Sequence, residues 1–500
     1  MQLPYENVWI NVIIFLAVIA FAIVTYCKRL YTFWERNGVP YLPSTVPFGN
    51  VLEIFTRNQS YGEVMAYRYK IAKSKKYKHL GLFGFTKPEY MPIDLELLKD
   101  ILIKDFNYFC DRGFYSNEEI DVLSGNLFSL GGNKWRKMRT KLSPTFTSGK
   151  IKTMFNIVLE CSRQLKHAVD IQCEKGPMDV KDFLSRFGTD VIGSCAFGLN
   201  CNSFVNAENE FCVYSQKLFN PTIFESFKGM MSMYFPVIIE SFKAKIFSVE
   251  MSDFYIKTFR EVVEYRKKNN VVRNDFLQIL IALMEDESSI SMEEATAQAF
   301  VFFLAGFETS STVLTFCLLE LVLNEEVQDK LRKEINDNMK KHNNIMTYDS
   351  IKELVYMRQV LDEVMRKYPP VATLNRQCVM DYKISNTDLV LKKGTNVIIS
   401  VLGIQNDPEY FPEPEKFDPE RFSPTNKENL SQFCYMPFGE GPRVCIGLRF
   451  GVLQMKIALS MLLNNYRFTL NEKTVLPVKM NPRSFILSPM GSILLNVEKI

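Results

Sequence analysis

Residues 291–323 form the most restrictive segment of this chain, because they are apolar on almost every side of a helix. The segment opens with Ser291-Met-Glu-Glu294, where a serine followed three residues later by a glutamate is the capping-box signature of a helix start. The apolar pattern continues through Ala295–Leu323. A helix that is apolar all round must be buried on every side, and about thirty residues extend over roughly 45–50 Å. We therefore expect one central helix that crosses a large domain.

Helical patterns dominate the rest of the chain, and strand-like pieces are short. Polar-faced helices are predicted over Glu325–Lys341 and Asp349–Lys367, the second of which is stopped by Pro369-Pro370. The pieces that indicate strands are Leu80–Phe85, Val397–Val401 and Ser492–Val497. The expected fold class is therefore mainly α with a minor β region. Without a further linker or repeat, residues 51–500 are expected to form one large domain, although 500 residues alone would suggest about three.

An uncharged apolar run lies near the N-terminus, from Val8 to Cys27. At 1.5 Å per residue it spans about 30 Å, the thickness of the hydrocarbon core of a bilayer. A cleaved signal peptide is the alternative, but its basic residues would precede a shorter run, whereas here Lys28, Arg29 and Arg36 follow it. Residues 1–30 are therefore expected to be a single-pass membrane anchor, with the rest of the chain on the cytosolic side.

The segment after this run, residues 31–50, is predicted to be a hinge between the anchor and the body. Within it, Gly38–Gly49 contains Pro40, Pro43 and Pro47 and cannot be a helix. The prolines and their apolar neighbours predict a stiff, apolar connection.

Composition excludes several classes of protein. Hydrophobic residues make up 47% of the chain and charged residues 23%, which excludes a disordered or collagen-like chain. A net charge of +4 gives no reason to expect a nucleic acid as a partner. The 11 cysteines are odd in number and show no C-x-x-C pair, which argues against a disulfide framework. Because the 3 histidines are far apart in sequence, any metal must rely on thiolate, carboxylate or a bound macrocycle.

The stretch that carries the chemistry is Phe438-Gly-Glu-Gly-Pro-Arg-Val-Cys-Ile-Gly447, which precedes an apolar helical pattern from Leu448 to about Leu463. A thiolate at Cys445 would be stabilised by the helix N-terminus and by backbone N–H groups. Such a sulfur can bind an iron whose other ligands come from a macrocycle, and Arg443 can pair with a macrocycle carboxylate. The alternative is a buried cysteine in a glycine-rich turn, but the complete pattern is very improbable by chance.

As a whole, this stretch resembles the haem-binding loop of the cytochrome P450 family. The resemblance implies haem b as the cofactor, with its iron bound by Cys445 and with Phe438 and Arg443 beside it. Further matches follow in the family's order over nearly the whole chain. Glu363-Val-Met-Arg366 and Pro419-Glu-Arg-Phe422 resemble a motif pair that implies a buried network of Glu363, Arg366 and Arg421.

Four residues outside this loop are expected to hold the haem propionates. Trp135-Arg-Lys-Met-Arg139 resembles the family's W-x-x-x-R, in which the two side chains share one helix face and bind a propionate. Arg112 and Arg376 occupy positions where the family has further propionate partners. For each single arginine, the alternative is a surface ion pair.

The long apolar helix contains Ala305-Gly-Phe-Glu-Thr-Ser310, which resembles the family's oxygen-activation motif. The resemblance implies that Gly306 leaves room for a diatomic ligand and that Glu308 and Thr309 are the catalytic residues of a proton relay. A threonine in the middle of a helix more often bonds back to its own helix. We expect local loosening of the helix to reconcile the two roles.

Several short sequence segments resemble those of the microsomal class and, within it, of the insect family-6 enzymes that handle plant toxins and insecticides. They are Leu142–Gly149, Asp111–Tyr115 and Asp407–Pro412. One departure is Gln405-Asn406, where histidines are expected in close relatives.

The expected function is that of a monooxygenase in the endoplasmic reticulum membrane that inserts one oxygen atom of O2 into lipophilic molecules. Candidate substrates are xenobiotics and endogenous lipids or hormones, and the sequence does not distinguish between them. Electrons would come from NADPH through NADPH-cytochrome P450 reductase, with cytochrome b5 as an optional second donor. The alternatives are a haem-thiolate isomerase or dehydratase that needs no reductase, and a catalytically silent haem or lipid binder.

Two further groups of residues are assigned by position in the expected fold. The lysines Lys134, Lys137 and Lys141 face away from Trp135, so we expect them either to be a solvated surface or to dock the reductase. The expected pocket walls are residues 120–128, 218–227, 300–305, 371–374 and 484–490.

Overall fold

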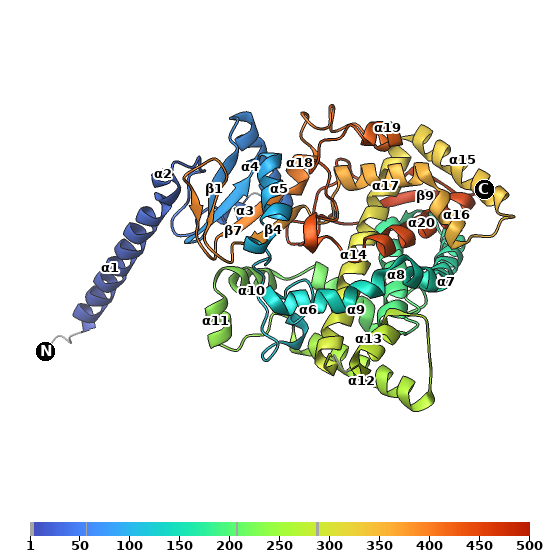
Figure 1. Cartoon of the computed structure of the whole chain (residues 1–500), viewed down its shortest axis with the longest axis horizontal. Coiled ribbons are helices and arrows are strands. Elements are labelled where there is room, and N and C mark those ends of the chain that lie inside the picture. The colour runs from blue at the N-terminus through green and yellow to red at the C-terminus, as the bar shows by residue number, and fades with distance from the viewer. Residues whose placement is uncertain (1–4, 57, 207–208, 287–289) are drawn as a thin grey trace.

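Helix α14 (Met292–Leu323) passes through the middle of the molecule, as the sequence predicts (Figure 1). It begins with the expected capping box, in which the Glu294 N–H donates to the Ser291 hydroxyl at 3.1 Å and the Ser291 N–H donates to the Glu294 carboxylate at 2.8 Å. It packs most extensively against α8 (Val180–Ile192), and also against α12 (Val249–Asn269) and α17 (Val355–Lys367). Burial on all sides therefore explains its apolar sequence.

The computed structural model describes residues 5–56, 58–206, 209–286 and 290–500. Besides the four helices already named, the described α-helices are α1 (Tyr5–Tyr31), α2 (Phe33–Arg36), α3 (Leu52–Thr56), α4 (Tyr61–Ser74), α5 (Leu95–Lys99), α6 (Gly132–Leu142), α7 (Ser148–Cys173), α9 (Glu210–Phe219), α10 (Ile223–Tyr234), α11 (Pro236–Ser241), α13 (Phe276–Glu285), α15 (Glu325–Lys341), α16 (Tyr348–Glu353), α18 (Val401–Gln405), α19 (Pro424–Lys427) and α20 (Leu448–Asn465). The predicted helices at Glu325 and Leu448 are thus confirmed.

In the described part of the chain, the β region consists of three small sheets. They are formed by β1 (His79–Gly84), β2 (Lys87–Pro92), β3 (Met178–Asp179), β4 (Thr373–Gln377), β5 (Tyr382–Lys383), β6 (Val390–Leu391), β7 (Asn396–Ser400), β8 (Tyr466–Leu470) and β9 (Leu494–Lys499). The largest has the order β1-β2-β7-β4, with a parallel pair β2–β7 between two antiparallel pairs. The others are β3-β9-β8 and β5-β6. The predicted strands match β1, β7 and β9 within two residues, which confirms a mainly α fold with a minor β region.

The helix predicted over Asp349–Lys367 is wrong in one respect, because the chain forms α16 and α17 with a break at Leu354. Side chains from other helices stabilise this break. The Lys456 ammonium of α20 donates to the Ile351 and Leu354 carbonyls at 3.2 and 2.6 Å. The Glu334 carboxylate of α15 accepts from the first backbone N–H groups of α17. Tertiary contacts that satisfy free helix ends therefore override the helical pattern.

Residues 31–50 pack against the body. Trp34 is buried, and its indole N–H donates to the Leu82 carbonyl at 2.8 Å. Gly81 makes this approach possible, because a Cβ there would lie 2.4 Å from the Trp34 ring. Val39 belongs to the same core cluster as the four-stranded sheet. The segment expected to be a hinge is thus packed against the body. The division of the chain at residues 30 and 50 stays a prediction.

Helix α1 extends away from the rest of the molecule (Figure 1). Two helical stretches among the described residues are long and apolar enough to cross a membrane, namely Val8–Arg36 and α14. Of the apolar window in each, 0% is buried in the first and 72% in the second. Helix α14 is therefore a core helix, whereas the N-terminal helix exposes its apolar surface and could serve as a membrane anchor.

Candidate active site

An internal cavity of about 250 Å³ lies beside the middle of α14. Its walls come from α6, α14, β4 and the loop before α20. Most of its lining is aromatic or aliphatic, and the aromatic members include Phe114, Phe128, Phe146, Phe302, Phe450 and Phe485. Of the five expected wall segments, four contribute, and none of the described residues in 218–227 lines the cavity. The site is therefore an apolar chamber inside the fold.

The loop from Phe438 to Gly447 presents Cys445 to this chamber. The Cys445 N–H donates to the Phe438 carbonyl at 2.9 Å, which closes the loop on itself. Gly441 has a φ of +74°, and a Cβ there would lie 2.0 Å from the Leu102 carbonyl oxygen. Only glycine fits this close approach in this conformation. The glycine-rich sequence is thus what lets the loop bend tightly and point its sulfur inward.

The Cys445 side chain is exposed to the cavity, and desolvation by the protein atoms packed around it raises the pKa of its thiol. The backbone N–H groups of Gly447 and Leu448 and the charges of Arg112 and Arg139 oppose the rise. The expected stabilisation of a thiolate by the helix start is present but is outweighed by burial. A cationic ligand bound to the sulfur would be needed to make the thiolate the stable form.

Four arginines also line the chamber, and none of its described lining residues is Asp or Glu. Burial is the first cause that lowers the pKa of Arg112 to about 10, of Arg376 to about 9 and of Arg443 to about 8. The arginines also lower one another's pKa, because Arg112 lies close to both Arg376 and Arg443. Concentrated buried positive charge is unfavourable without an anion. The chamber therefore fits a ligand that brings carboxylates to the arginines and a metal to the sulfur, as haem does.

Arg376 and Arg112 are brought together by the backbone, because the Gln377 N–H donates to the Asp111 carbonyl at 2.8 Å. Arg376 is 2% exposed, and its Nε has no hydrogen-bond partner. Its Nη1 donates only to the Asn375 carbonyl, at 2.9 Å. Arg112 donates to the carbonyls of Phe128 and Arg443. Arg376 is thus the group with the clearest unfilled donor toward a carboxylate.

Arg443 is engaged differently from the sequence expectation. Its Nε and Nη2 donate to the Cys110 and Leu130 carbonyls at 2.8 and 2.7 Å, and its Nη1 donates to the Leu127 carbonyl at 3.3 Å. These bonds tie the loop that carries Cys445 to the wall of the chamber. A pairing of Arg443 with a cofactor carboxylate stays a prediction, since its donors are directed to backbone carbonyls and its Nη2 also lies 3.8 Å from the Asp111 carboxylate.

Trp135 and Arg139 both lie on α6 and both line the chamber, as their spacing predicts. Trp135 is buried, and the guanidinium carbon of Arg443 lies 3.9 Å from the centroid of its ring. This cation–π contact helps to hold a charge that has lost its water. The expected contact of the indole with a propionate stays a prediction.

The expected relay residues do not all face the chamber. Gly306 and Thr309 line it, but Glu308 does not. The Thr309 hydroxyl donates to the Ala305 carbonyl at 2.6 Å, and α14 is continuous there, so the expected loosening of the helix is not observed. The space that Gly306 leaves is taken by Ile192 of α8, which a Cβ would approach to 2.6 Å. The glycine therefore lets α8 pack close to α14, and the expectation that it also leaves room for a ligand stays a prediction.

Glu308 is buried, and burial raises the pKa of its carboxyl to about 7. The charge of Lys181 and a hydrogen bond with Thr312 act in the opposite direction. A carboxyl that titrates near neutral pH can both release and accept a proton under physiological conditions. It is placed one helix position from Thr309, behind the cavity wall.

This carboxyl should make the stability of the protein depend on pH. Because its folded pKa of about 7 lies above the ordinary value of 4.5, the folded chain holds the proton more tightly than the unfolded chain does. The free energy of unfolding should therefore fall as the pH rises from 4.5 to about 7 and level off above that. Glu308→Gln should remove about 3 kcal/mol of this fall, as measured by urea unfolding at a series of pH values. Burial also raises the pKa of Glu89 to about 7, so the variant should keep part of the pH dependence of stability. A Glu308→Gln variant with the full wild-type pH dependence would contradict the assignment to Glu308.

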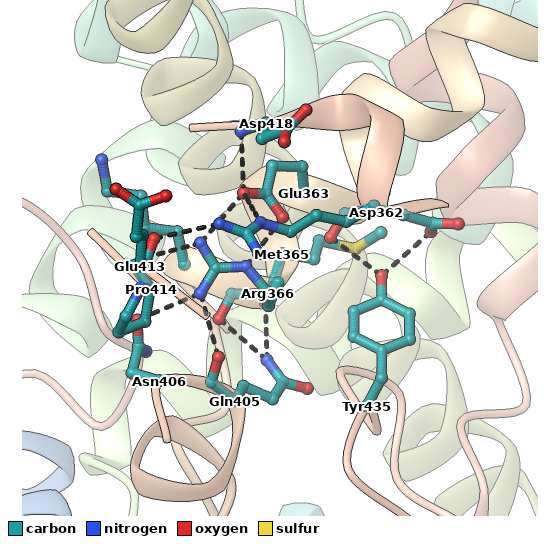
Figure 2. Close-up of polar contacts among 12 residues, drawn as sticks. Asp362, Glu363, Met365, Arg366, Gln405, Asn406, Glu413, Pro414, Asp418 and Tyr435 are labelled. Carbon is teal, nitrogen blue, oxygen red and sulfur yellow. Dashed lines mark hydrogen bonds and ion pairs between the residues drawn. The ribbon is translucent and has the colours of Figure 1, made fainter. Parts of the chain in front are cut away.

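The network of Glu363, Arg366 and Arg421 is confirmed, and Figure 2 shows its Glu363–Arg366 pair. Arg366 donates to both carboxylate oxygens of Glu363, at 2.7 and 2.9 Å, and Arg421 approaches the same carboxylate at 3.5 Å. The Asp418 N–H also donates to Glu363, at 3.0 Å. The network lies away from the chamber and joins α17 to the loops that lead toward Cys445.

Two buried glutamines near the site have structural roles that the sequence motifs do not predict. Gln298 of α14 accepts from the Leu127 N–H at 2.9 Å and donates to the Gly125 carbonyl at 3.0 Å, which holds one wall of the chamber. Gln405 contacts the segment before Phe438. For Gln298 a signal was available, because it is an amide within an otherwise apolar helix.

The expected lysine cluster is only partly a free surface. Lys134 pairs with Glu118 at 2.7 Å, and Lys141 is half-buried. Lys137 is exposed on the same helix, and Arg449 is exposed at the start of α20. The exposed positive groups here are thus Lys134, Arg136, Lys137 and Arg449, of which Lys134 is paired with Glu118.

The fold and the site define a haem-thiolate enzyme, and comparison with known proteins agrees. The family model for cytochrome P450 matches residues 40–496, so the chain belongs to the cytochrome P450 family. Members of this family are monooxygenases that hold haem through a cysteine thiolate.

Three relatives from insects show the similarity over nearly the whole chain. "Probable cytochrome P450 6a13" of Drosophila melanogaster is 40% identical over 470 residues, which is 94% of each chain. "Cytochrome P450 6A1" of Musca domestica is 39% identical over 97% of each chain. "Cytochrome P450 6j1" of Blattella germanica is 37% identical over 99% of each chain. The expected likeness to the insect family-6 enzymes is confirmed.

Proposed function

We propose that this protein is a membrane-bound monooxygenase that oxidises lipophilic small molecules with O2, using electrons that reach it from NADPH through NADPH-cytochrome P450 reductase. The observation that carries the proposal is the convergence of Cys445 with four arginines inside one apolar chamber whose described lining contains no Asp or Glu; the ion pair of Arg443 with Asp111, at 3.8 Å, reaches outside that lining. Family membership supports the general activity. The electron source, the substrate class and the cellular location are the parts that go beyond it.

The cysteine, the arginines and the tryptophan of the chamber each have a role in this proposal. Cys445 binds the iron, and Arg112, Arg139, Arg376 and Trp135 hold the propionates, with Arg376 as the strongest candidate because its Nε is unpaired. Phe438 and Arg443 shape the loop through their backbone contacts. The haem, when bound, supplies the activation of O2 and the transfer of one oxygen atom to the substrate.

Protons are handled by Thr309 and Glu308. The Thr309 hydroxyl is at the chamber wall, and it becomes a donor to a molecule in the chamber once it rotates away from the Ala305 carbonyl. Glu308 replaces the proton from behind, since its carboxyl titrates near neutral pH. An isomerase or dehydratase would need neither group.

The substrates are apolar, because the chamber offers aromatic and aliphatic contacts over most of its wall. Xenobiotics such as plant toxins or insecticides, and endogenous lipids or hormones, fit this description. Location in the endoplasmic reticulum membrane, with the body on the cytosolic side, is supported by the exposed apolar surface of α1 and by the basic residues that follow it. Cytochrome b5 would be a second electron donor at the same membrane.

The proposal is tested by reconstituting the full chain in phospholipid vesicles with haem, reductase and NADPH. We expect O2 consumption that depends on the reductase and that is coupled to oxidation of a lipophilic substrate. Rearrangement of peroxides without reductase would indicate an isomerase or dehydratase. Haem binding without reduction by any reductase would indicate a silent haem binder, and either result would overturn the proposal.

Docking of the reductase should depend on Lys137 and Arg449. The double variant Lys137→Glu/Arg449→Glu should slow reductase-supported turnover, most strongly at low salt, because charge steering acts on association and is screened by ions. The measurement is the rate of NADPH-dependent turnover against salt concentration. Lys268→Glu, an exposed lysine of α12, is the control and should have no effect. If turnover driven by an added peroxide fell equally, the two residues would be supporting the haem site instead.

A further inference from the structure

Gln405 is the last residue of α18 and is 0% exposed. It lies between the end of α17 and the segment that leads to the loop carrying Cys445 (Figure 2). A fully buried amide needs partners for its two N–H groups and its oxygen. All three are satisfied here.

The side-chain nitrogen of Gln405 donates to the carbonyls of Met365 and Arg366, at 2.9 and 3.0 Å. These carbonyls belong to the last turn of α17, where the helix itself provides no donors. The side-chain oxygen accepts from the Met436 N–H at 2.9 Å. One side chain therefore bridges the end of α17 and the backbone just before Phe438.

The same residue is held at its backbone by the buried ion pair. The Arg366 Nη1 donates to the Gln405 carbonyl at 3.0 Å and to the Asn406 side chain at 3.3 Å. The Arg366 Nη2 donates to the Pro414 carbonyl at 2.7 Å. Arg366, already fixed by Glu363, thus fixes the place of Gln405 in turn.

From Met436 the connection continues to the sulfur ligand. The Gly439 N–H donates to the Met436 carbonyl at 3.0 Å, and the Cys445 N–H donates to the Phe438 carbonyl at 2.9 Å. Met436 itself is buried, so its N–H has no access to water if Gln405 is removed. An unbroken series of hydrogen bonds therefore runs from Glu363 through Gln405 to the loop of Cys445.

We propose that Gln405 is a positioning residue for the Cys445 loop, which it couples to the Glu363–Arg366 pair through the Met436 N–H. This inference rests on the proposed role of Cys445 as the iron ligand. The chemistry of the side chain makes glutamine well suited to this position. A neutral histidine has one ring N–H to donate and one ring nitrogen to accept, and a methionine has neither of the two donors.

The test compares Gln405→Met with Gln405→His and with a matched control, Gln328→Met. Gln328 is 2% exposed, donates to the Leu321 and Phe468 carbonyls, and accepts from the Phe468 N–H, so its loss removes the same set of backbone bonds. It joins the end of α14 to β8, and none of these bonds reaches the loop of Cys445.

The first measurement is the rate of haem release from the loaded protein, with the fraction of the ferrous carbon-monoxide complex that has the thiolate-type spectrum. For Gln405→Met we expect release about 10–100-fold faster, as for other partners that orient a metal ligand, and a reduced thiolate-type fraction. Gln405→His should be intermediate. Gln328→Met should lower the unfolding temperature but leave both quantities unchanged.

The second measurement is amide hydrogen exchange of residues 436–445 in the haem-free chain, which does not depend on the ligand assignment. Exchange there should be faster in Gln405→Met than in the wild type and in Gln328→Met. If the wild type lacked the thiolate-type spectrum, the proposed role of Cys445 would fail while this exchange result still decided whether Gln405 orders the loop. If Gln405→Met does not fold, Gln405→His takes its place in both measurements. Wild-type release and exchange in the Gln405 variants, or equal changes in Gln328→Met, would overturn the inference.

Discussion

Cys445→Ala is expected to abolish substrate oxidation and the thiolate-type spectrum of the ferrous carbon-monoxide complex. The reason is that no other described residue of the chamber offers an anionic ligand, since its remaining polar groups are arginines, amides, hydroxyls and an indole. The side-chain change itself is small, and the alanine fits the same loop. Turnover and the spectrum, measured on the variant loaded with haem, should be lost together.

Cys434→Ala is the matched control. Cys434 lies in the segment just before Met436, is fully buried and does not line the chamber. Its replacement should leave the spectrum intact and should lower the free energy of unfolding only by the cost of the small cavity that it creates. If Cys445→Ala kept the thiolate-type spectrum, or Cys434→Ala lost it, the ligand assignment would be wrong.

The hydrogen bonds within the protein do not fully compensate the buried charges of the arginine cluster. Arg112, Arg376 and Arg443 each lose hydration, and each raises the cost of charging the others. Arg443 compensates with backbone carbonyls, whereas Arg376 is left with an unpaired Nε. An anionic ligand would relieve both the missing hydration and the mutual repulsion. Binding of the cofactor and stability of the fold are therefore expected to be strongly linked.

The sequence predicted those parts of the fold in which local pattern and burial agree. Helix α14 was predicted with its cap, because an apolar surface on all sides and a capping box leave few alternatives. The break at Leu354 was not predicted, because Lys456 and Glu334, which satisfy the free helix ends, are distant in sequence. Contacts of this kind leave no periodic signal.

The same distinction holds for the site. Cys445 and the arginines were identified because the spacing of whole motifs carries information beyond each residue. The direction in which a side chain points is not contained in that spacing. The spacing therefore assigns Glu308 to a proton relay without showing that its side chain lies outside the chamber lining, and it does not show that Ile192 packs on Gly306. The sequence shows Gln405 only as a departure from the expected histidine, because no motif contains both Gln405 and Met436, to which its side chain is hydrogen-bonded.

Removing Glu363 is expected to destabilise the protein more than removing Arg366, although the two form one ion pair. Both side chains are 0% exposed, and they are joined by two hydrogen bonds. Breaking a buried pair by deleting one partner typically costs about 3–5 kcal/mol, because the remaining charge is left without compensation. In Glu363→Leu the remaining group is the Arg366 guanidinium, which cannot lose its proton and stays charged.

In Arg366→Met the remaining group is a carboxyl, which can become neutral by taking up a proton. Burial raises the pKa of Glu363 even with Arg366 present, and without Arg366 it should rise further. Because this folded pKa lies above the ordinary one, the deficit of Arg366→Met should be largest at high pH and shrink as the pH falls through the folded pKa. The deficit of Glu363→Leu should show no such relief. Urea unfolding of both variants as a function of pH measures the difference.

A surface pair serves as the control. Glu160→Gln breaks the pair of Arg163 with Glu160, in which both side chains are about 60% exposed, and should change the free energy of unfolding by less than about 1 kcal/mol at any pH. Equal, pH-independent losses in Glu363→Leu and Arg366→Met would mean that the two residues act through packing rather than through charge. If the predicted asymmetry is observed, the fold requires Glu363 because it compensates the buried charge of Arg366. Arg366 in turn holds Gln405, which orders the loop that holds Cys445.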